Sequence, residues 1–247
     1  MRKLCTLLFL LITATNIASA QKYLVIHHSN GETTELNISD IDSINIETIE
    51  RDTVKTLNNH VFVDLGLPSG LWWATCNVGA ENAEDFGYYF AWGETSTKET
   101  FTLENYKYGV SIEDSLITKY NSTDDLTILE AEDDAATANW GEGVRMPTKE
   151  ELVELQTNCT WTWDNPKKGY HVKSRVNGNE IFLPAAGSKK DGDVSNKGID
   201  CYIWSSTRHA TRTNYAHYLD GAKGYIFPES PYHRYYGRSV RPVAEIK

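Results

Sequence analysis

Hydrophobic and polar positions alternate over two short segments near the start of the chain. Residues 23–28 and 32–38 each read as a β-strand, and Ser29-Asn30-Gly31 between them is typical of a tight hairpin turn. A weaker alternation at 41–46 predicts another short strand. Because so few strands bury little surface, residues 21–55 are expected to form only a small N-terminal β unit. This unit is expected to end in a linker, because the stretch 47–59 is polar and rich in Thr.

Denser hydrophobic runs then predict a main domain over residues 60–247. Strands are expected at 61–65, 71–76 and 88–92. Residues 94–130 are polar with little periodicity, which predicts a long surface excursion.

Two short helices are predicted in the middle of the chain. Acidic residues open the segment 132–136, which is favourable at a helix N-terminus, and Gly141 is placed to end that helix. Thr148-Lys149-Glu150-Glu151 is a capping box, and the apolar stripe of Leu152, Val153 and Leu155 follows it.

The remainder of the chain is predicted to be antiparallel β-structure. The pair Asn177-Gly178 predicts a tight hairpin between the first two strands. Helices early and strands late indicate an α+β fold rather than a βαβ repeat. The expected strands are 171–176, 180–183, 202–205, 215–219, 225–227 and 238–243.

The first twenty residues have the pattern of a cleaved signal peptide. Arg2 and Lys3 precede an apolar run over 4–12, and Ala18-Ser19-Ala20 supplies the small residues of a cleavage site. The run is shorter than the ~20 residues that a membrane-spanning helix needs. The sequence therefore predicts export, to the periplasm, the cell surface or the medium, without membrane insertion.

Charge and cysteine content restrict the partners and the covalent chemistry. The formal net charge of −10 becomes −12 once Arg2 and Lys3 are removed, which disfavours binding to nucleic acid. Cys76, Cys159 and Cys201 remain after export, and a Cys76–Cys159 disulfide is the preferred pairing, with three buried free thiols as the alternative.

Seven segments of the main domain carry a family resemblance. They are VDLGLPSGLWWATCNVGA (63–80), YFAWGE (89–94), EDDAA (132–136), RMPTKE (145–150), FLPAAG (182–187), WSS (204–206) and SVRP (239–242). In this order they resemble the Fibrobacter succinogenes major paralogous domain family of exported Bacteroidetes proteins, over residues 61–243. The resemblance implies a C-type-lectin-like fold, related to the sulfatase-modifying-factor type, with two short helices, small antiparallel sheets and long loops. The family has no established activity.

No motif predicts an enzyme, a metal site or a cofactor. Sulfatase-modifying relatives use two nearby cysteines, whereas Cys201 is the only cysteine after residue 160. No Gly-x-Ser-x-Gly element occurs, nor do the sugar-binding motifs of calcium-dependent lectins. Glu130 and the acidic residues 132–134 could offer oxygens to a cation, but a helix start explains the last three.

The region 201–242 is the predicted binding surface. It contains seven of the fourteen Tyr and three of the seven His of the chain, interspersed with Arg and small residues, as in an antibody paratope. Strand alternation buries one face only, so several rings are expected to be exposed. The candidate ligand-binding residues are Arg208, His209, Arg212, Tyr215, Tyr218, Tyr225, Tyr232, His233 and Tyr235.

The sequence thus predicts a non-enzymatic recognition module that binds a glycan or a protein without calcium or any cofactor. Two alternatives stay open. The chain could be a structural or adhesin subunit of an envelope assembly, or a ligand-binding protein whose C-terminal region is diversified by a retroelement. The oligomeric state is not set by the sequence.

Overall fold

The computed structural model describes residues 22–27, 31–43, 53–109 and 117–246. The chain divides into two compact units, Met1–Arg51 and Asp52–Lys247. The predicted signal peptide and residues 47–52 of the predicted linker lie outside the described residues. Within the described part of the chain no helix is long and apolar enough to span a bilayer.

The first unit contains the predicted hairpin. Strand β1 (Tyr23–His27) pairs antiparallel with β2 (Thr33–Asn37), and a short 3-10 turn, η1 (Ile38–Asp40), follows. The predicted turn lies mostly outside the described residues, as does much of the strand predicted at 41–46; its described part, 41–43, is not a strand. Every described side chain of this unit is at least partly exposed, as expected for a two-stranded sheet.

A five-stranded sheet opens the second unit and joins both ends of its chain. The strand order is β3-β4-β5-β15-β6, and Trp73 of β5 lies between Val63 of β4 and Val243 of β15. Strand β3 begins six residues before the predicted domain start at His60, so the interpretation of 54–57 as linker is wrong. The strands are β3 (Val54–Leu57), β4 (His60–Asp64), β5 (Trp72–Ala74), β6 (Val144–Arg145) and β15 (Val243–Ala244).

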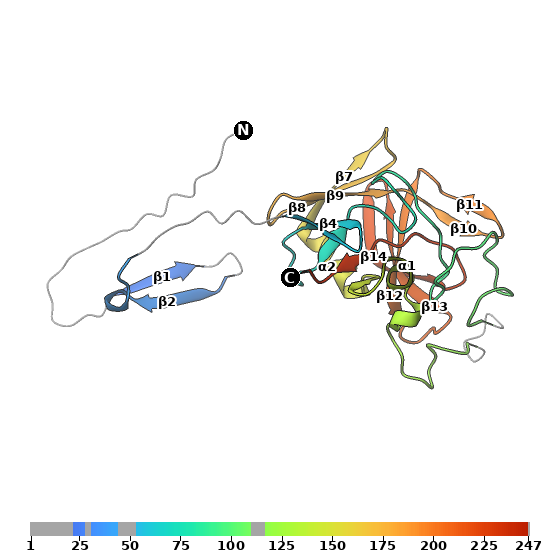
Figure 1. The fold of residues 1–247 in the computed structure, drawn as a ribbon, viewed down its shortest axis with the longest axis horizontal. Helices are drawn as coiled ribbons and strands as arrows, with labels where there is room; N and C mark the ends of the chain where they lie inside the picture. Colours follow the sequence, from blue (N-terminus) through green and yellow to red (C-terminus); the bar gives the residue numbers. More distant parts are fainter. Residues whose placement is uncertain (1–21, 28–30, 44–52, 110–116, 247) are drawn as a thin grey trace. The chain divides into compact units, whose positions relative to one another are not determined.

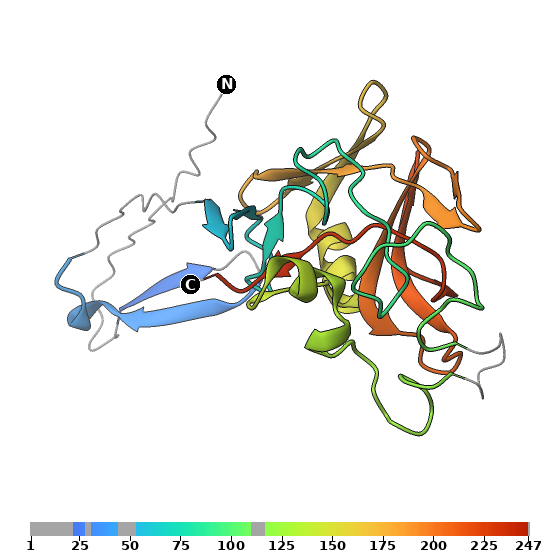
Figure 2. The same cartoon turned by 45° about the vertical axis from the view of Figure 1, so that its right-hand side comes forward.

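Three smaller antiparallel sheets complete the β-structure (Figures 1 and 2). The predicted hairpin at Asn177-Gly178 is confirmed between β8 and β9. The first sheet contains β7 (Cys159–Asp164), β8 (Gly169–Ser174) and β9 (Glu180–Pro184). The second is the hairpin of β10 (Ser188–Lys190) and β11 (Asp193–Ser195). The third contains β12 (Asp200–Arg208), β13 (Tyr215–Ala222) and β14 (Tyr225–His233).

Both predicted helices are present, and the predicted end at Gly141 and the predicted capping box are confirmed, but the first helix begins at Ala135, so the acidic residues precede it instead of forming its first turn. The acidic segment forms a 3-10 turn, η3 (Ala131–Asp133), and Asp134 then caps α1 (Ala135–Trp140) by accepting hydrogen bonds from two backbone amides. Thr148 and Glu151 form the capping box of α2 (Lys149–Asn158). The described chain therefore has the predicted α+β class.

Two hydrophobic clusters form the core, one on each side of the β12–β14 sheet. The first contains Trp92, Trp204 and Tyr218, and the second contains Trp73, Ile203 and Leu219. Two predictions are wrong here. Residues 88–92 form only an isolated bridge, Phe90 to Arg238, instead of a strand. The described residues of the segment 94–130 are not a surface excursion, because they bury four aromatic side chains in the first cluster: Phe101, Tyr106, Tyr108 and Tyr120.

Candidate functional site

One face of the β12–β14 sheet carries a group of aromatic rings. Trp204 of β12 lies opposite Tyr218 of β13, and Tyr202 lies opposite Asp220 two residues along on the same face. Ring centroids of Tyr218 lie 5.6 Å from Tyr202, 5.8 Å from Trp204 and 6.4 Å from Tyr232 of β14. The residues on the opposite face of β12 and β13, such as Ile203 and Leu219, belong to the second hydrophobic cluster.

The guanidinium of Arg238 lies among these four rings. Its central carbon is 3.4 Å from the ring centroid of Tyr218 and between 4.8 and 5.0 Å from those of Tyr202, Trp204 and Tyr232. Two backbone hydrogen bonds to Phe90, both 3.0 Å, fix the main chain of Arg238. The aromatic faces therefore provide cation–π attraction to a guanidinium whose position is set by the fold.

Arg238 is nevertheless incompletely satisfied. The residue is only 2% exposed, and its Nε and Nη1 atoms are buried without a hydrogen-bond partner in the described part of the chain. Burial lowers its pKa. The carboxylates of Asp200 and Asp220 accept hydrogen bonds from the hydroxyls of Tyr202, at 2.7 Å, and Tyr218, at 3.1 Å. A buried charge that lacks such bonds is costly, so this guanidinium retains capacity for an acceptor.

A cavity of about 300 Å³ opens beside Arg238, and we call it the Arg238 pocket. The β10–β11 hairpin, drawn in orange in Figures 1 and 2, lies beside the sheet and forms one wall. Gly187 precedes this hairpin with φ of 68°, and a Cβ there would lie 2.1 Å from the carbonyl oxygen of Ser195. The pocket is lined by Ser188, Lys190, Ser195, Asn196, Tyr202, Tyr218, Tyr232, Tyr236 and Arg238.

The nine predicted binding residues do not form one site. Only Tyr218 and Tyr232 line the Arg238 pocket. Tyr225, 47% exposed, borders a different cavity of about 570 Å³ beside Trp161 and Trp163. Arg208, another predicted binding residue, is 7% exposed and donates hydrogen bonds to the backbone carbonyls of Leu126, His209 and Ala210.

The other five predicted residues include a linked aromatic group near the end of β14. The Arg212 guanidinium lies 4.4 Å from the ring centroid of Tyr215, whose hydroxyl is 3.0 Å from Nε2 of His233. The His233 and Tyr235 rings are 5.5 Å apart. His209 stacks instead on His217, at 5.3 Å. This group provides polar and aromatic surface but does not line the Arg238 pocket.

Seven of the nine lining residues were not predicted from the sequence: Ser188, Lys190, Ser195, Asn196, Tyr202, Tyr236 and Arg238. Tyr202 is partly buried and lines the pocket. Arg238 fell within a predicted strand, where nothing distinguished it from the neighbouring Arg241. The sequence signal for Arg238 as a binding residue would have been an arginine in a predicted strand with buried alternate positions and no acidic residue nearby in sequence to pair with it.

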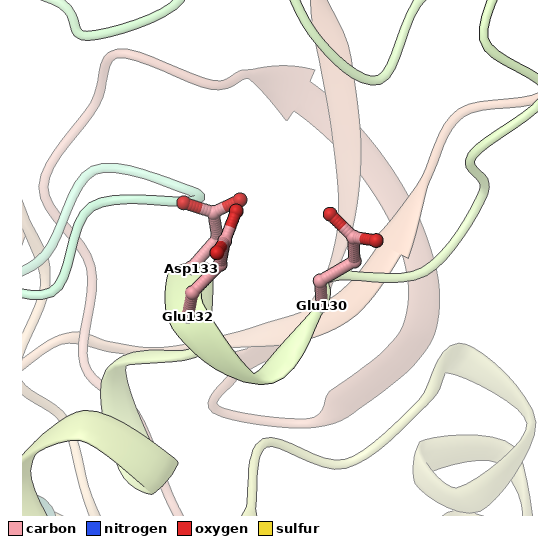
Figure 3. Close-up of side chains that lie close together, drawn as sticks. All are labelled: Glu130, Glu132 and Asp133. Atoms are coloured by element: carbon pink, nitrogen blue, oxygen red, sulfur yellow. The ribbon is translucent and has the colours of Figure 1, made fainter.

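Three carboxylates lie close together at η3 and could in principle hold a cation (Figure 3). The ammonium of Lys119 lies between them, 2.6 Å from Glu130, 2.8 Å from Glu132 and 2.6 Å from Asp133. Asp133, 1% exposed, also accepts hydrogen bonds from Lys107 at 2.6 Å, from Tyr120 at 2.7 Å and from Tyr108. These carboxylates are thus paired with protein cations, and Asp133 is a buried hub rather than only part of a helix start.

The preferred disulfide between Cys76 and Cys159 is not formed, since all three described cysteines are free. Cys76 packs against the first hydrophobic cluster and donates to the carbonyl of Ala80, whereas Cys159 belongs to the second cluster. Burial raises the pKa of Cys159 to about 11 and that of Cys201 to about 12. Thiols held in this state are poor nucleophiles.

Comparison of the chain with models of protein families, with curated proteins and with solved structures gives no match.

Proposed function

We propose that this chain is an exported, non-enzymatic recognition module whose C-type-lectin-like domain binds a glycan in the Arg238 pocket. The observation that carries the proposal is a buried guanidinium with unpaired nitrogens at a cavity walled by four tyrosines. Concave sites with an apolar lining and a few fixed polar groups are typical of small-ligand binding.

The contacts of Arg241 support the proposed family and fold. This buried residue donates hydrogen bonds of 2.9 Å to the side chain of Asn77 and to the carbonyls of Ala74 and Phe182. Three of the segments that resemble the family thus meet at one guanidinium. These segments therefore have a structural role in holding the domain together.

A glycan fits the pocket better than the flat face of a protein partner does. A stable protein interface is a broad surface that buries about 800 Å² on each side. The Arg238 pocket is instead a concavity of about 300 Å³, at the small end of the volumes of small-ligand sites. Tyrosine rings offer rigid apolar faces for the C–H groups of a sugar, while the hydroxyls of Tyr202 and Tyr218 already donate to Asp200 and Asp220. Ser188, Ser195 and Asn196 add neutral hydrogen-bonding groups at the wall.

The thiol positions support a non-catalytic role. The oxidation carried out by sulfatase-modifying proteins needs a pair of reactive cysteines, and Cys201 is buried alone in its half of the chain with a raised pKa.

The test is a glycan array probed with the wild-type chain and two tyrosine variants. Tyr232→Ala removes a pocket wall that is 37% exposed, and Tyr88→Ala removes an exposed tyrosine that does not line the pocket. We expect the first variant to lose at least tenfold in affinity for the glycans that the wild type binds, and the second to bind normally. Equal binding by the two variants, or no binding by the wild type to any glycan, would refute the proposal.

A further inference from the structure

We propose that the sugar unit held in the Arg238 pocket is anionic, carrying a carboxylate or a sulfate ester that pairs with Arg238. This inference rests on the proposed function and specifies its ligand class. It depends on the charge, the hydrogen bonding and the dimensions of the pocket.

The charged groups that line the pocket are positive, and the acidic groups near it lie outside the lining. Arg238 and Lys190 both line it, and no Asp or Glu is among its lining residues. The nearest acidic groups, Asp200 and Asp220, are hydrogen-bonded to Tyr202 and Tyr218. Lys190 has an exposed ion pair with Asp191, 3.4 Å long, and such a pair exchanges readily with other anions. An anionic ligand would therefore meet two cations and no competing carboxylate in the pocket lining.

The hydrogen-bonding capacity of Arg238 matches the same ligand. A guanidinium presents its N–H groups as a planar fork that bonds two oxygens of a carboxylate or sulfate at once. In the described residues Nε and Nη1 have no acceptor, and the stacked ring of Tyr218 covers one face of the guanidinium without satisfying its edge. Nε and Nη1 belong to different edges of the planar guanidinium, so an oxyanion that bonds the Nη1–Nη2 edge or the Nε–Nη2 edge would supply an acceptor to one of these nitrogens and neutralise the buried charge.

The cavity dimensions and walls favour a sugar as the carrier of that anion. Tyr202, Tyr232 and Tyr236 offer ring faces beyond the guanidinium, and a volume of about 300 Å³ leaves room for one ring with its substituents. Asn196 also lines the cavity, where its amide donates to the hydroxyl of Tyr202 at 3.0 Å and its side-chain oxygen is an acceptor group for a sugar hydroxyl.

The experiment is an NMR titration of the full chain with glucuronate, glucose 6-sulfate and glucose, observing the Nε–H resonance of Arg238. We expect glucuronate or glucose 6-sulfate to shift this resonance and to bind at least tenfold more tightly than glucose. The affinity should fall as salt is raised. Comparison of the two anions identifies which group the pocket prefers.

Two variants test the residues. Arg238→Lys keeps the charge but loses the planar fork, and we expect at least tenfold weaker binding of the preferred anion. Lys190→Gln lies at the exposed rim and should weaken binding about threefold with little effect on folding. If Arg238→Lys does not fold, the Arg238 resonance and the Lys190 variant still decide the question.

The outcomes separate this inference from the proposed function. Equal affinity for glucose and glucuronate, with wild-type binding to glycans on the array, would overturn the anionic ligand alone. Tighter binding of a blocked Gly-Glu-Gly peptide than of either anionic sugar would overturn the sugar. Absence of any glycan binding would overturn the proposed function itself.

Discussion

Asp133 offers the sharpest test of how the irregular part of the domain is held together. Its side chain accepts hydrogen bonds from two lysines and two tyrosines while being 1% exposed. In Asp133→Asn the amide oxygen serves at most two of these four donors, and the new N–H₂ group faces the others. The substitution also leaves the ammoniums of Lys107 and Lys119 without their buried counter-charge.

The size of the effect follows from these contacts. Removing one partner of a buried ion pair costs about 3–5 kcal/mol, and the lower end of this range applies here because Asp133 is buried while Lys107 and Lys119 are 47% and 23% exposed. For a domain of this size each kcal/mol lowers the melting temperature by about 2–4 °C, so Asp133→Asn should lower it by roughly 10 °C. Burial alone would raise the pKa of Asp133, but the hydrogen bonds from the lysines and tyrosines hold it well below 3.8. The stabilisation is therefore present above pH 3.8 and is lost as the pH falls through the lowered pKa.

The assay is denaturant unfolding followed by tryptophan fluorescence, with Glu132→Gln as the matched control. Glu132 contacts the same Lys119 ammonium, but its side chain is 74% exposed, so its loss should cost less than about 1 kcal/mol. If Asp133→Asn unfolds within about 1 kcal/mol of the wild type, the buried hub does not stabilise the domain as argued.

Three further predictions concern protonation, backbone conformation and thiol burial. Hydrogen bonds to Asp164 and Glu180 raise the pKa of His171. His171→Gln should therefore lower the stability by less than about 1 kcal/mol at pH 6, and the difference from the wild type should vanish as the pH rises through the raised pKa. A pH series of thermal melts checks this. Gly187→Ala should lower the free energy of unfolding, measured with denaturant, by about 3 kcal/mol, and Gly178→Ala by about 1 kcal/mol. Both glycines have positive φ, but only at Gly187 would the new Cβ meet backbone atoms. Equal losses in the two variants would contradict this reasoning. Iodoacetamide followed by mass spectrometry should label the partly exposed Cys76 in the native protein and Cys159 only after unfolding.

Features set by local sequence could be predicted well. The capping box at Thr148 and Glu151 and the hairpin at Asn177-Gly178 depend on residues within four positions of each other, and both are present. The α+β class follows from the order of such elements. In contrast, β3 was missed because the polar segment 54–57 has little hydrophobic pattern, and its strand conformation depends on pairing with β4.

The long segment after residue 94 shows what local pattern cannot provide. Its described residues are ordered by side chains rather than by a sheet or helix: the hydroxyl of Tyr106 bonds the carbonyl of Trp92 at 2.7 Å, and Tyr120 is fully buried. Periodicity detects one buried face of a regular element, so aromatic side chains buried from an irregular loop leave no signal.

The binding residues illustrate the same limit at the level of single side chains. Composition indicated that Tyr and Arg in 201–242 form a surface, and the pocket does lie on that sheet, but composition could not rank the arginines. Arg208 follows a bulge in β12 that carries it to the backbone carbonyls of Leu126, His209 and Ala210, which accept from its Nε and Nη1. Arg238 is placed by its backbone bridge to Phe90, 148 positions away, against aromatic rings, and its Nε and Nη1 have no partner among the described residues. Which guanidinium keeps unpaired nitrogens is therefore decided by contacts between residues distant in sequence, and the proposed binding site depends on contacts that local motifs do not specify.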